Sequence, residues 1–470
     1  MSELQTLSLD AATLSRGYRE GRFTPVDVVE EVYRRIAARR NDRVWLHLAP
    51  RAEALRRAAD LQATGPEGLA LYGLPYGVKD NIDVAGWPTT AGCEALRYVP
   101  ERSAAVVERL DAAGAINLGK QNMDQFATGL VGVRTVGAAC HNAIDPRYVP
   151  GGSSSGSAVA VAAGLTTFSI GSDTGGSGRV PAAYNNIVGL KPTPGLVSSR
   201  GFLYCNRSFD VPPVFALTVD DAYAVLDTIV GADPEDSHSV VRPDGEHTWG
   251  RDTPPGLFRF AVPHREQLEF FGDTVARRHF DAVVDTLHGL GGTATEIDFE
   301  PFLEAGRLVF DSPFIAERWV TYGATLEARP ETVHPVVAGA IAKARGYSAA
   351  ETFAAQYRLK DLQAHTARLL SGVDCLAVPT VGTLYTVAEV EADPLRLNTR
   401  MGHYTYFANP LRLAAISVPA GLRSDGLPFG LSLIGPSFSE ARLGAIARTV
   451  QARLAGRLGA TATQFHEVVR

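Results

Sequence analysis

The sequence predicts an α/β fold in which a mostly parallel mixed sheet is covered by helices on both faces. Three observations carry this prediction. A helical apolar pattern at 104–113 ends at Gly114 and is followed at once by a strand pattern at 115–119. From about residue 71 onward, short apolar runs are broken by glycine. Helices that alternate with strands in this way typically cover a parallel sheet. Further strand patterns lie at 258–262, 375–378, 416–418 and 429–434.

Helices dominate the predicted N-terminal part, about residues 1–70. Thr24 and Pro25 provide an N-cap and a first-turn proline, and Asp27 occupies the third helical position. The apolar side chains that follow recur at helical spacing, namely Val28, Val29, Val32 and Ile36. Later helices are predicted at 218–230, with Thr218 as N-cap and Asp221 three residues on, and at 273–290 and 439–454.

Composition indicates one ordinary globular domain. The chain has 470 residues, of which 45% are hydrophobic and 20% charged. No internal repeat or low-complexity segment divides it, so we expect a single domain over 1–470 with its core at about 71–210. The loosest stretch, 234–255, is predicted to be a surface loop.

Charge and cysteine content exclude several functional classes. A net charge of -6 argues against a general nucleic-acid binder, whose surface would be basic. The four cysteines, Cys93, Cys140, Cys205 and Cys375, are scattered, which favours a reduced protein over a disulfide framework. The start of the chain lacks an apolar signal region, and no run is long enough to span a bilayer. We therefore expect a cytoplasmic protein with no membrane or nucleic-acid partner.

Three segments carry residues suited to catalysis. The first, 74–81, places Lys79 directly after an apolar strand pattern. Taken alone it is weak evidence, since most lysines are ordinary solvated side chains.

The second segment, 151–157, is rich in glycine and serine and leads directly into the alanine-rich helical pattern at 158–164. A flexible linker is the alternative interpretation. A loop at a helix N-terminus, however, presents backbone N–H groups and hydroxyls together, which suits a developing negative charge. The linker interpretation is therefore less favoured.

The third segment, 171–182, places paired glycines immediately before Ser177. Such a turn can aim several N–H groups at one point beside a nucleophilic hydroxyl, as acyl transfer requires. A phosphate-binding loop or a plain turn is the alternative, but the usual nucleotide fingerprints are missing.

The base that would activate this serine is not evident from common motifs. No histidine lies in a recognisable catalytic pattern, although His141 is the nearest in sequence. The nucleophile-elbow pattern GxSxG does not fit the third segment, and HExxH is absent. A lysine can serve as base if burial lowers its pKa enough to leave it neutral.

Together, the three segments resemble the amidase signature family, whose members use a Ser–cisSer–Lys triad. The resemblance extends over nearly the whole chain, including the C-terminal stretches 416–421 and 426–430. It implies an amidohydrolase fold of one large domain that needs neither a metal nor an organic cofactor.

Carried over position by position, the resemblance implies that Lys79 is the base and Ser153 is the bridging serine, preceded by a cis peptide. Ser177 is then the nucleophile. The implied oxyanion hole is formed by the N–H groups from Thr174 to Ser177, including those of Gly175 and Gly176.

Within the family, segments 122–130, 178–192 and 316–318 are similar to the allophanate hydrolase branch. Members of that branch hold the substrate carboxylate with an arginine that matches Arg318 and a tyrosine eight residues earlier. Gly129 and Ser154 are further expected substrate-binding positions.

Two departures from the branch bear on the substrate. The tyrosine position is Phe310, and the next residue is Asp311. A lost hydroxyl and a gained carboxylate disfavour an anion and favour a cation. The preferred hypothesis is therefore hydrolysis of guanylurea, a cationic urea derivative, held at Phe310, Asp311 and Arg318. We also expect no second domain of the kind that allophanate hydrolases carry.

Two alternatives stay open. Asp311 could pair with Arg318 or face solvent, in which case the substrate would be allophanate. Less favoured is an amidotransferase A-type subunit that acts within a tRNA-dependent complex. The resemblance implies a small-molecule substrate as the main partner, and a homodimer.

Overall fold

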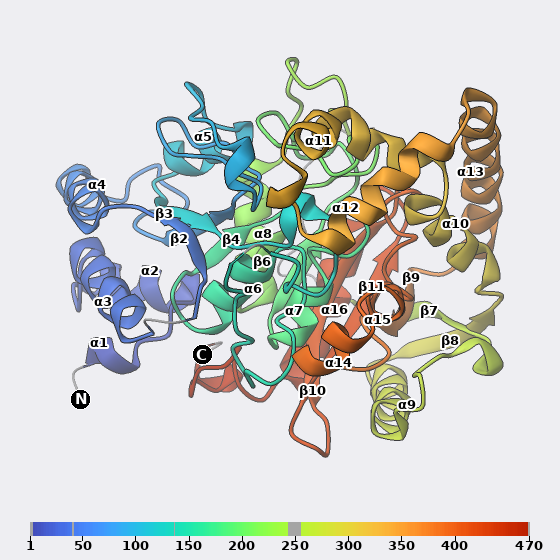
Figure 1. Cartoon of the computed structure of the whole chain (residues 1–470). Helices are drawn as coiled ribbons and strands as arrows, with labels where there is room; N and C mark the ends of the chain where they lie inside the picture. Colours follow the sequence, from blue (N-terminus) through green and yellow to red (C-terminus); the bar gives the residue numbers. More distant parts are fainter. Residues whose placement is uncertain (1–2, 40–41, 136, 243–254, 469–470) are drawn as a thin grey trace.

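A single mixed sheet runs through the molecule (Figure 1). The computed structural model describes residues 3–39, 42–135, 137–242 and 255–468. The 11 strands of the sheet follow one another in space in this order: β1 (Trp45–Leu48), β3 (Ile116–Gln121), β2 (Pro75–Lys79), β4 (Phe168–Ile170), β6 (Val214–Ala216), β5 (Val188–Lys191), β10 (Ala414–Leu422), β11 (Pro428–Gly435), β9 (Cys375–Pro379), β7 (Phe258–Pro263) and β8 (Gly292–Ile297).

The mixed sheet is confirmed, but the prediction that it is mostly parallel is wrong. The pairs β2–β3, β2–β4, β7–β8 and β7–β9 are parallel. The other six described pairs are antiparallel: β1–β3, β4–β6, β5–β6, β5–β10, β10–β11 and β9–β11. Parallel neighbours need a long crossover, whereas the short turn between β10 and β11 reverses the chain directly.

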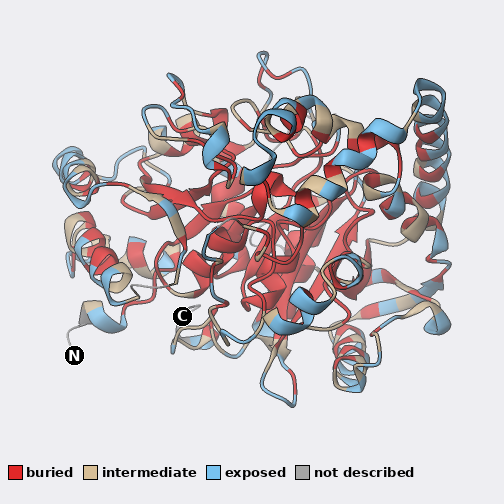
Figure 2. Ribbon diagram, in the orientation of Figure 1, coloured by how far each residue is buried: buried red, intermediate tan, exposed pale blue. Residues whose placement is uncertain are grey.

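Helices cover both faces of the sheet, as predicted. Along β6, Val214 and Ala216 pack in the core that includes α8, whereas Phe215 between them packs with α6 and α7. Alternate strand residues point to opposite faces, so these helices lie on opposite sides. Figure 2 shows the buried residues gathered on the sheet between helices whose outer faces are exposed.

The first face is covered by α2 (Ala11–Arg19), α3 (Pro25–Ala38), α4 (Arg51–Thr64), α5 (Ala105–Ala112), α8 (Val219–Ile229), α9 (Thr274–Gly289) and α16 (Glu440–Leu454). The second is covered by α6 (Ser155–Ala162), α7 (Val180–Tyr184), α10 (Glu300–Phe310) and α13 (Ala349–Leu369). The remaining helices are α1 (Glu3–Thr6), α11 (Ala316–Ala328), α12 (Pro335–Ala342), α14 (Val387–Ala392), α15 (Arg396–Met401) and α17 (Phe465–Val468).

The predicted helix starts are confirmed at α3 and α8. Thr24 accepts from the backbone N–H of Asp27, whose carboxylate accepts from the N–H of Thr24 at 2.8 Å. At α8, Thr218 Oγ1 accepts from the N–H of Asp221 at 3.1 Å. These caps satisfy N–H groups that have no partner within the helix.

The N-terminal 70 residues are not purely helical, because β1 pairs with β3 at the edge of the sheet. Of the predicted surface loop at 234–255, residues 243–254 lie outside the described residues. In the described part of the chain, no helix combines the length and apolar character needed to cross a membrane.

Candidate active site

Lys79 is placed by the sheet itself. It is the last residue of β2, and the parallel neighbour β4 ends just before Gly171 and Ser172. Because the carboxyl ends of parallel strands lie at one edge of a sheet, Lys79 meets the residues that follow β4. Its Nζ lies 2.9 Å from Ser172 Oγ and 3.3 Å from the Ser172 carbonyl oxygen.

The side chains of Lys79, Ser153 and Ser177 form one hydrogen-bonded row. Lys79 Nζ lies 2.7 Å from Ser153 Oγ, which lies 2.8 Å from Ser177 Oγ. The peptide bond between Gly152 and Ser153 is cis. Lys79 and Ser153 are completely buried, and Ser177 retains 3% exposure. The structure therefore brings together the three residues that the sequence predicted as a catalytic triad.

The surroundings of Lys79 favour its neutral form. Burial lowers the pKa of Lys79 to about 8, because the enclosed ammonium loses its hydration, and the nearby Asp210 only partly opposes this. A neutral amine has two N–H groups and one lone pair, yet Nζ has three oxygen neighbours. One of the two serine hydroxyls, that of Ser153 or that of Ser172, must then donate to it.

The nucleophile loop, residues 173–179, is held from below by a buried carboxylate. Asp173 accepts hydrogen bonds from the backbone N–H groups of Gly176 and Gly178, at 2.7 and 2.9 Å. It also forms a fully buried ion pair with Arg179 at 3.0 Å. Burial acts to raise the pKa of Asp173, but the Arg179 guanidinium outweighs it and holds the pKa below its usual value. Asp173 is therefore a carboxylate that fixes the loop.

The N–H groups beside Ser177 differ from the predicted oxyanion hole at one position. Because Gly176 donates to Asp173, its N–H is already occupied. Within the described residues, the N–H groups of Thr174, Gly175 and Ser177 meet no acceptor. The N–H groups that are available to an oxyanion are therefore three instead of the predicted four, because Asp173 already accepts from Gly176.

Asp210 is a site residue that sequence reasoning missed. The Thr174 hydroxyl donates to Asp210 Oδ1, and the N–H of Cys205 donates to Oδ2 at 2.6 Å. Asp210 thus joins the nucleophile loop to the segment around Cys205. Burial raises its pKa to about 6. Asp210 lies in no recognisable sequence motif, so only its position in the folded structure identifies it as a site residue.

Arg318 is completely buried and only partly satisfied. Its Nε donates to Cys205 Sγ at 3.1 Å, and its Nη1 donates to the Val309 carbonyl at 3.3 Å. Its Nη2 is buried and has no hydrogen-bond partner among the described residues. A buried cation with a free donor is energetically costly unless an anion joins it.

Phe310 connects Arg318 to the nucleophile loop. The Arg318 guanidinium lies 4.7 Å from the centre of the Phe310 ring. A methyl group at Gly175 would lie 3.4 Å from the same ring. Arg318, Phe310 and the oxyanion donors therefore belong to one continuous site.

Comparison of the whole chain with known proteins identifies its family. The family model for amidases matches residues 27–443, which is most of the chain and includes every residue of the triad. This chain belongs to the amidase family. The expectation of an amidase-family hydrolase that acts on amide C–N bonds is thereby confirmed.

Relatives of this amidase differ in length and in name. Urea amidolyase of Saccharomyces cerevisiae is 40% identical over 402 residues, which cover 85% of this chain but 22% of that protein. The chain thus spans about a fifth of that relative. The A subunit of glutamyl-tRNA(Gln) amidotransferase from an Exiguobacterium species is 34% identical over 92% of this chain and 95% of its own length.

Among solved structures, allophanate hydrolase from Kluyveromyces lactis superposes with a TM-score of 0.91 at 35% identity, covering 98% of this chain and 76% of that one. The large mixed sheet with its covering helices is therefore the amidase fold.

Asp311 of the amidase does not lie where the cation hypothesis requires it. Its carboxylate is 61% exposed and pairs with Lys343 at 3.4 Å, itself 56% exposed. Asp311 is the C-cap of α10, and it is exposed although the four residues that follow it are buried. The structure therefore agrees with the alternative in which Asp311 faces solvent, and it offers no desolvated carboxylate at this position to hold a cationic substrate.

Two other predicted substrate-binding residues, Ser154 and Gly129, lie close to the triad. The Ser154 hydroxyl is buried and donates to the Ser172 carbonyl at 3.2 Å, so it supports the loop below Lys79. Gly129 adjoins the triad, because the carbonyl of Leu130 accepts from the N–H of Gly152 at 2.7 Å. A methyl group at Gly129 would lie 2.8 Å from the carboxylate of Asp124, which leaves no room for a side chain.

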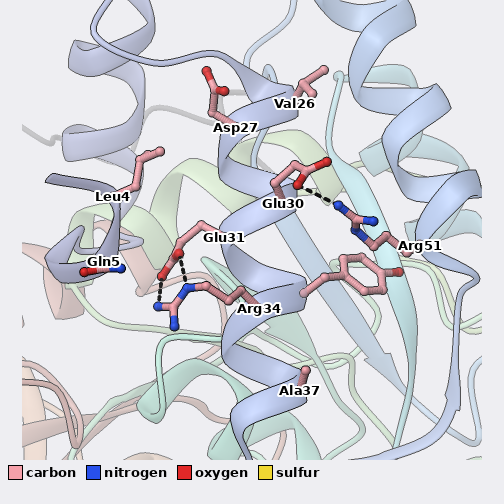
Figure 3. Close-up of a pocket in the computed structure, with 10 residues that line it drawn as sticks. Leu4, Gln5, Val26, Asp27, Glu30, Glu31, Arg34, Ala37 and Arg51 are labelled. Carbon is pink, nitrogen blue, oxygen red and sulfur yellow. Dashed lines mark hydrogen bonds and ion pairs between the residues drawn. The ribbon is translucent and has the colours of Figure 1, made fainter. Parts of the chain in front are cut away.

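The surface hollow in Figure 3 is a separate feature of the amidase, because none of the residues that line it is a predicted site residue. It has a volume of about 780 Å³ and lies among α1, α3 and the start of α4. Four of its charged side chains are already paired, Glu30 with Arg51 at 2.6 Å and Glu31 with Arg34 at 2.7 Å. In the described part of the chain, no group of three or more His, Cys, Asp or Glu side chains could hold a metal ion.

Proposed function

We propose that this amidase hydrolyses the terminal carboxamide of allophanate, a small urea derivative that carries a carboxylate, and releases ammonia. The observation that carries the proposal is the buried Arg318 Nη2, which lacks a partner among the described residues. The Arg318 guanidinium lies over the Phe310 ring, and that ring adjoins Gly175 of the nucleophile loop. The names of two relatives, urea amidolyase and allophanate hydrolase, agree with this substrate class.

The first half of the reaction forms an acyl-enzyme. Neutral Lys79 accepts the proton of Ser153, which in turn takes the proton of Ser177. Ser177 Oγ then attacks the carboxamide carbon, and a C–O bond forms as the carbonyl becomes an oxyanion. The free N–H groups of Thr174 and Gly175, with that of Ser177, stabilise this charge, each by roughly 3–4 kcal/mol.

The second half restores the enzyme. The proton held by Lys79 returns through Ser153 to the leaving nitrogen, the C–N bond breaks, and ammonia departs. A water molecule then loses its proton along the same row and attacks the acyl carbon. The acid product leaves, and Ser177 regains its hydroxyl.

Electrostatics distinguishes allophanate from guanylurea. Guanylurea would bring a second positive charge next to Arg318. Two like charges 4 Å apart repel by roughly 4 kcal/mol at the effective dielectric constant of a protein site, about 20. The carboxylate that was expected to offset this, Asp311, is paired with Lys343 at the surface. An anionic substrate instead gains the same attraction, so the site favours allophanate.

Kinetics with matched substrates test the proposal. Ammonia release is measured for allophanate, guanylurea, neutral biuret and glutamine. We expect Arg318→Met to raise KM for allophanate by about tenfold to a hundredfold, which corresponds to about 1.4–2.8 kcal/mol, and to change KM for biuret little. Asp311→Asn should change neither.

Other outcomes identify another function. Faster turnover of guanylurea than of allophanate, together with a higher KM for guanylurea in Asp311→Asn, would restore the cation hypothesis. Turnover of glutamine alone would favour the amidotransferase A-type role. The chain matches 95% of the length of an A subunit of glutamyl-tRNA(Gln) amidotransferase.

A further inference from the structure

A second unsatisfied group lies one helical turn from Arg318. Tyr322 follows Arg318 by four residues on α11, so both side chains emerge from the same face of that helix. Tyr322 is completely buried, and its hydroxyl has no hydrogen-bond partner in the described part of the chain. Buried polar groups are nearly always paired, so a lone hydroxyl beside a lone guanidinium donor needs an explanation.

The surroundings fix the Tyr322 ring firmly. It stacks on Phe126 with ring centres 4.2 Å apart and planes 15° from parallel. Tyr322 and Cys205 belong to the same buried cluster, and Cys205 also accepts from Arg318 Nε at 3.1 Å. Cys205 thus connects Arg318 to the buried cluster that contains Tyr322. Burial also raises the pKa of Tyr322 well above its ordinary value, which keeps the hydroxyl protonated and able to donate.

Phe310 lies beside Arg318 but provides no hydrogen-bond donor to a bound carboxylate. Its ring is occupied on one side by the Arg318 guanidinium at 4.7 Å and contacts Tyr406 at 4.4 Å between ring centres. Phenylalanine has no hydroxyl, so position 310 offers shape and a π face but no hydrogen bond. A carboxylate beside Arg318 can accept several hydrogen bonds on its two oxygens.

We propose that Tyr322 is a specificity-determining residue whose hydroxyl, together with Arg318 Nη2, holds the carboxylate of the substrate. Tyr322 supplies the hydroxyl donor that Phe310 lacks. This inference rests on the proposed function, because it deepens the account of how that site selects an anion over a neutral or cationic urea derivative.

Binding measurements in a variant that cannot turn over substrate test the inference directly. In the Ser177→Ala background, calorimetric titration with allophanate gives Kd without catalysis. We expect Tyr322→Phe to raise this Kd about tenfold, because one hydrogen bond to a charged group is lost. The Kd of neutral biuret should change less than about threefold. Adding Phe310→Tyr to Tyr322→Phe should restore much of the affinity, since it returns a hydroxyl to the neighbourhood of Arg318.

Stability separates this role from a structural one. Since the Tyr322 hydroxyl has no partner among the described residues, Tyr322→Phe should leave the unfolding midpoint unchanged or higher. The matched control is Tyr223→Phe, which removes a buried hydroxyl that donates to the Glu440 carbonyl at 2.5 Å. That variant should lower the midpoint and leave the Kd of allophanate unchanged.

Each result decides between the two proposals. If Ser177→Ala binds allophanate and Tyr322→Phe leaves that Kd unchanged, the role of Tyr322 is wrong and the proposed function stands. If Tyr322→Phe weakens binding but the wild type releases no ammonia from allophanate, the binding role stands and the proposed reaction fails. If the Ser177→Ala protein does not bind allophanate at all, both are overturned.

Discussion

Arg179 Nη2 lies 3.0 Å from Asp173 Oδ1 in an ion pair from which solvent is completely excluded. The pair lies beneath the nucleophile loop, and Arg179 also donates to the Thr405 carbonyl and to Asn409 Oδ1, each at 3.0 Å. The loop that carries Ser177 is thereby tied to the 402–409 turn of the chain. Its shape depends on groups more than 200 residues away in sequence.

Breaking this pair should destabilise the whole protein. Arg179→Met leaves the Asp173 carboxylate buried without its partner, which typically costs about 3–5 kcal/mol. The free energy of unfolding in denaturant measures the loss. Arg51→Met serves as the control, because its pair with Glu30 is half exposed and is worth about 0–1 kcal/mol. Equal effects of the two substitutions would contradict the importance of the buried pair.

Activity should rise with pH through the range set by Lys79. Only the neutral amine can accept a proton, and its pKa is lowered to about 8, so kcat/KM should increase up to about pH 8 and then level off. Burial also lowers the pKa of Lys191, to about 7, which makes it a useful control. Lys191→Met should leave the position of the Lys79 transition in place. A profile that follows a histidine and disappears in His141→Ala would overturn the assignment.

The same shift predicts how stability depends on pH. The pKa of Lys79 is about 8 in the folded protein and near the ordinary 10.5 when unfolded. Between these values the unfolded chain binds more protons, so the contribution of Lys79 to stability should rise with pH across this window. Lys79→Met should flatten that part of the stability profile, as measured by denaturant unfolding at several pH values.

Removing members of the hydrogen-bonded row should stop catalysis without unfolding the protein. Ser177→Ala should abolish ammonia release, and Ser153→Ala or Lys79→Ala should each lower kcat by several orders of magnitude, roughly 10⁴-fold or more. Circular dichroism should report an unchanged fold for Ser177→Ala. Activity near that of the wild type in this variant would refute the role of Ser177 as nucleophile.

Gly176 should tolerate no side chain. Its φ of +136° is accessible mainly to glycine, and a methyl group there would approach Thr405 Oγ1 to 2.3 Å. Gly176→Ala should therefore displace the N–H groups beside Ser177 and reduce kcat by about 10²-fold or more. Gly426→Ala is a control at positive φ with open space around it, and it should alter only stability.

Local signals in the sequence predicted much of the fold. The Thr24–Asp27 and Thr218–Asp221 pairs each specify a helix start within four residues, so they could be recognised without tertiary contacts. The strand at Trp45–Leu48 could not, because it exists through pairing with β3, some 70 residues later. The balance of parallel and antiparallel neighbours likewise depends on how distant strands come together.

The candidate site divides in the same way. Lys79, Ser153 and Ser177 lie in recognisable motifs, and the structure brings them into contact. The exposed position of Asp311 and the burial of the Tyr322 hydroxyl depend on where helices α10 and α11 pack. The sequence identifies such residues but does not show whether their side chains are buried or exposed.

The complete burial of Lys79 and Ser153 determines where the transferred proton resides during turnover. The base has no surface of its own in contact with bulk water, and Ser177 is the only exposed member of the row of Lys79, Ser153 and Ser177. While an acyl group occupies that serine, the proton taken from it is confined to the protein interior. The hydrogen delivered to ammonia is then drawn from the row of Lys79, Ser153 and Ser177, and the hydrolytic water replaces it when the acyl group is removed.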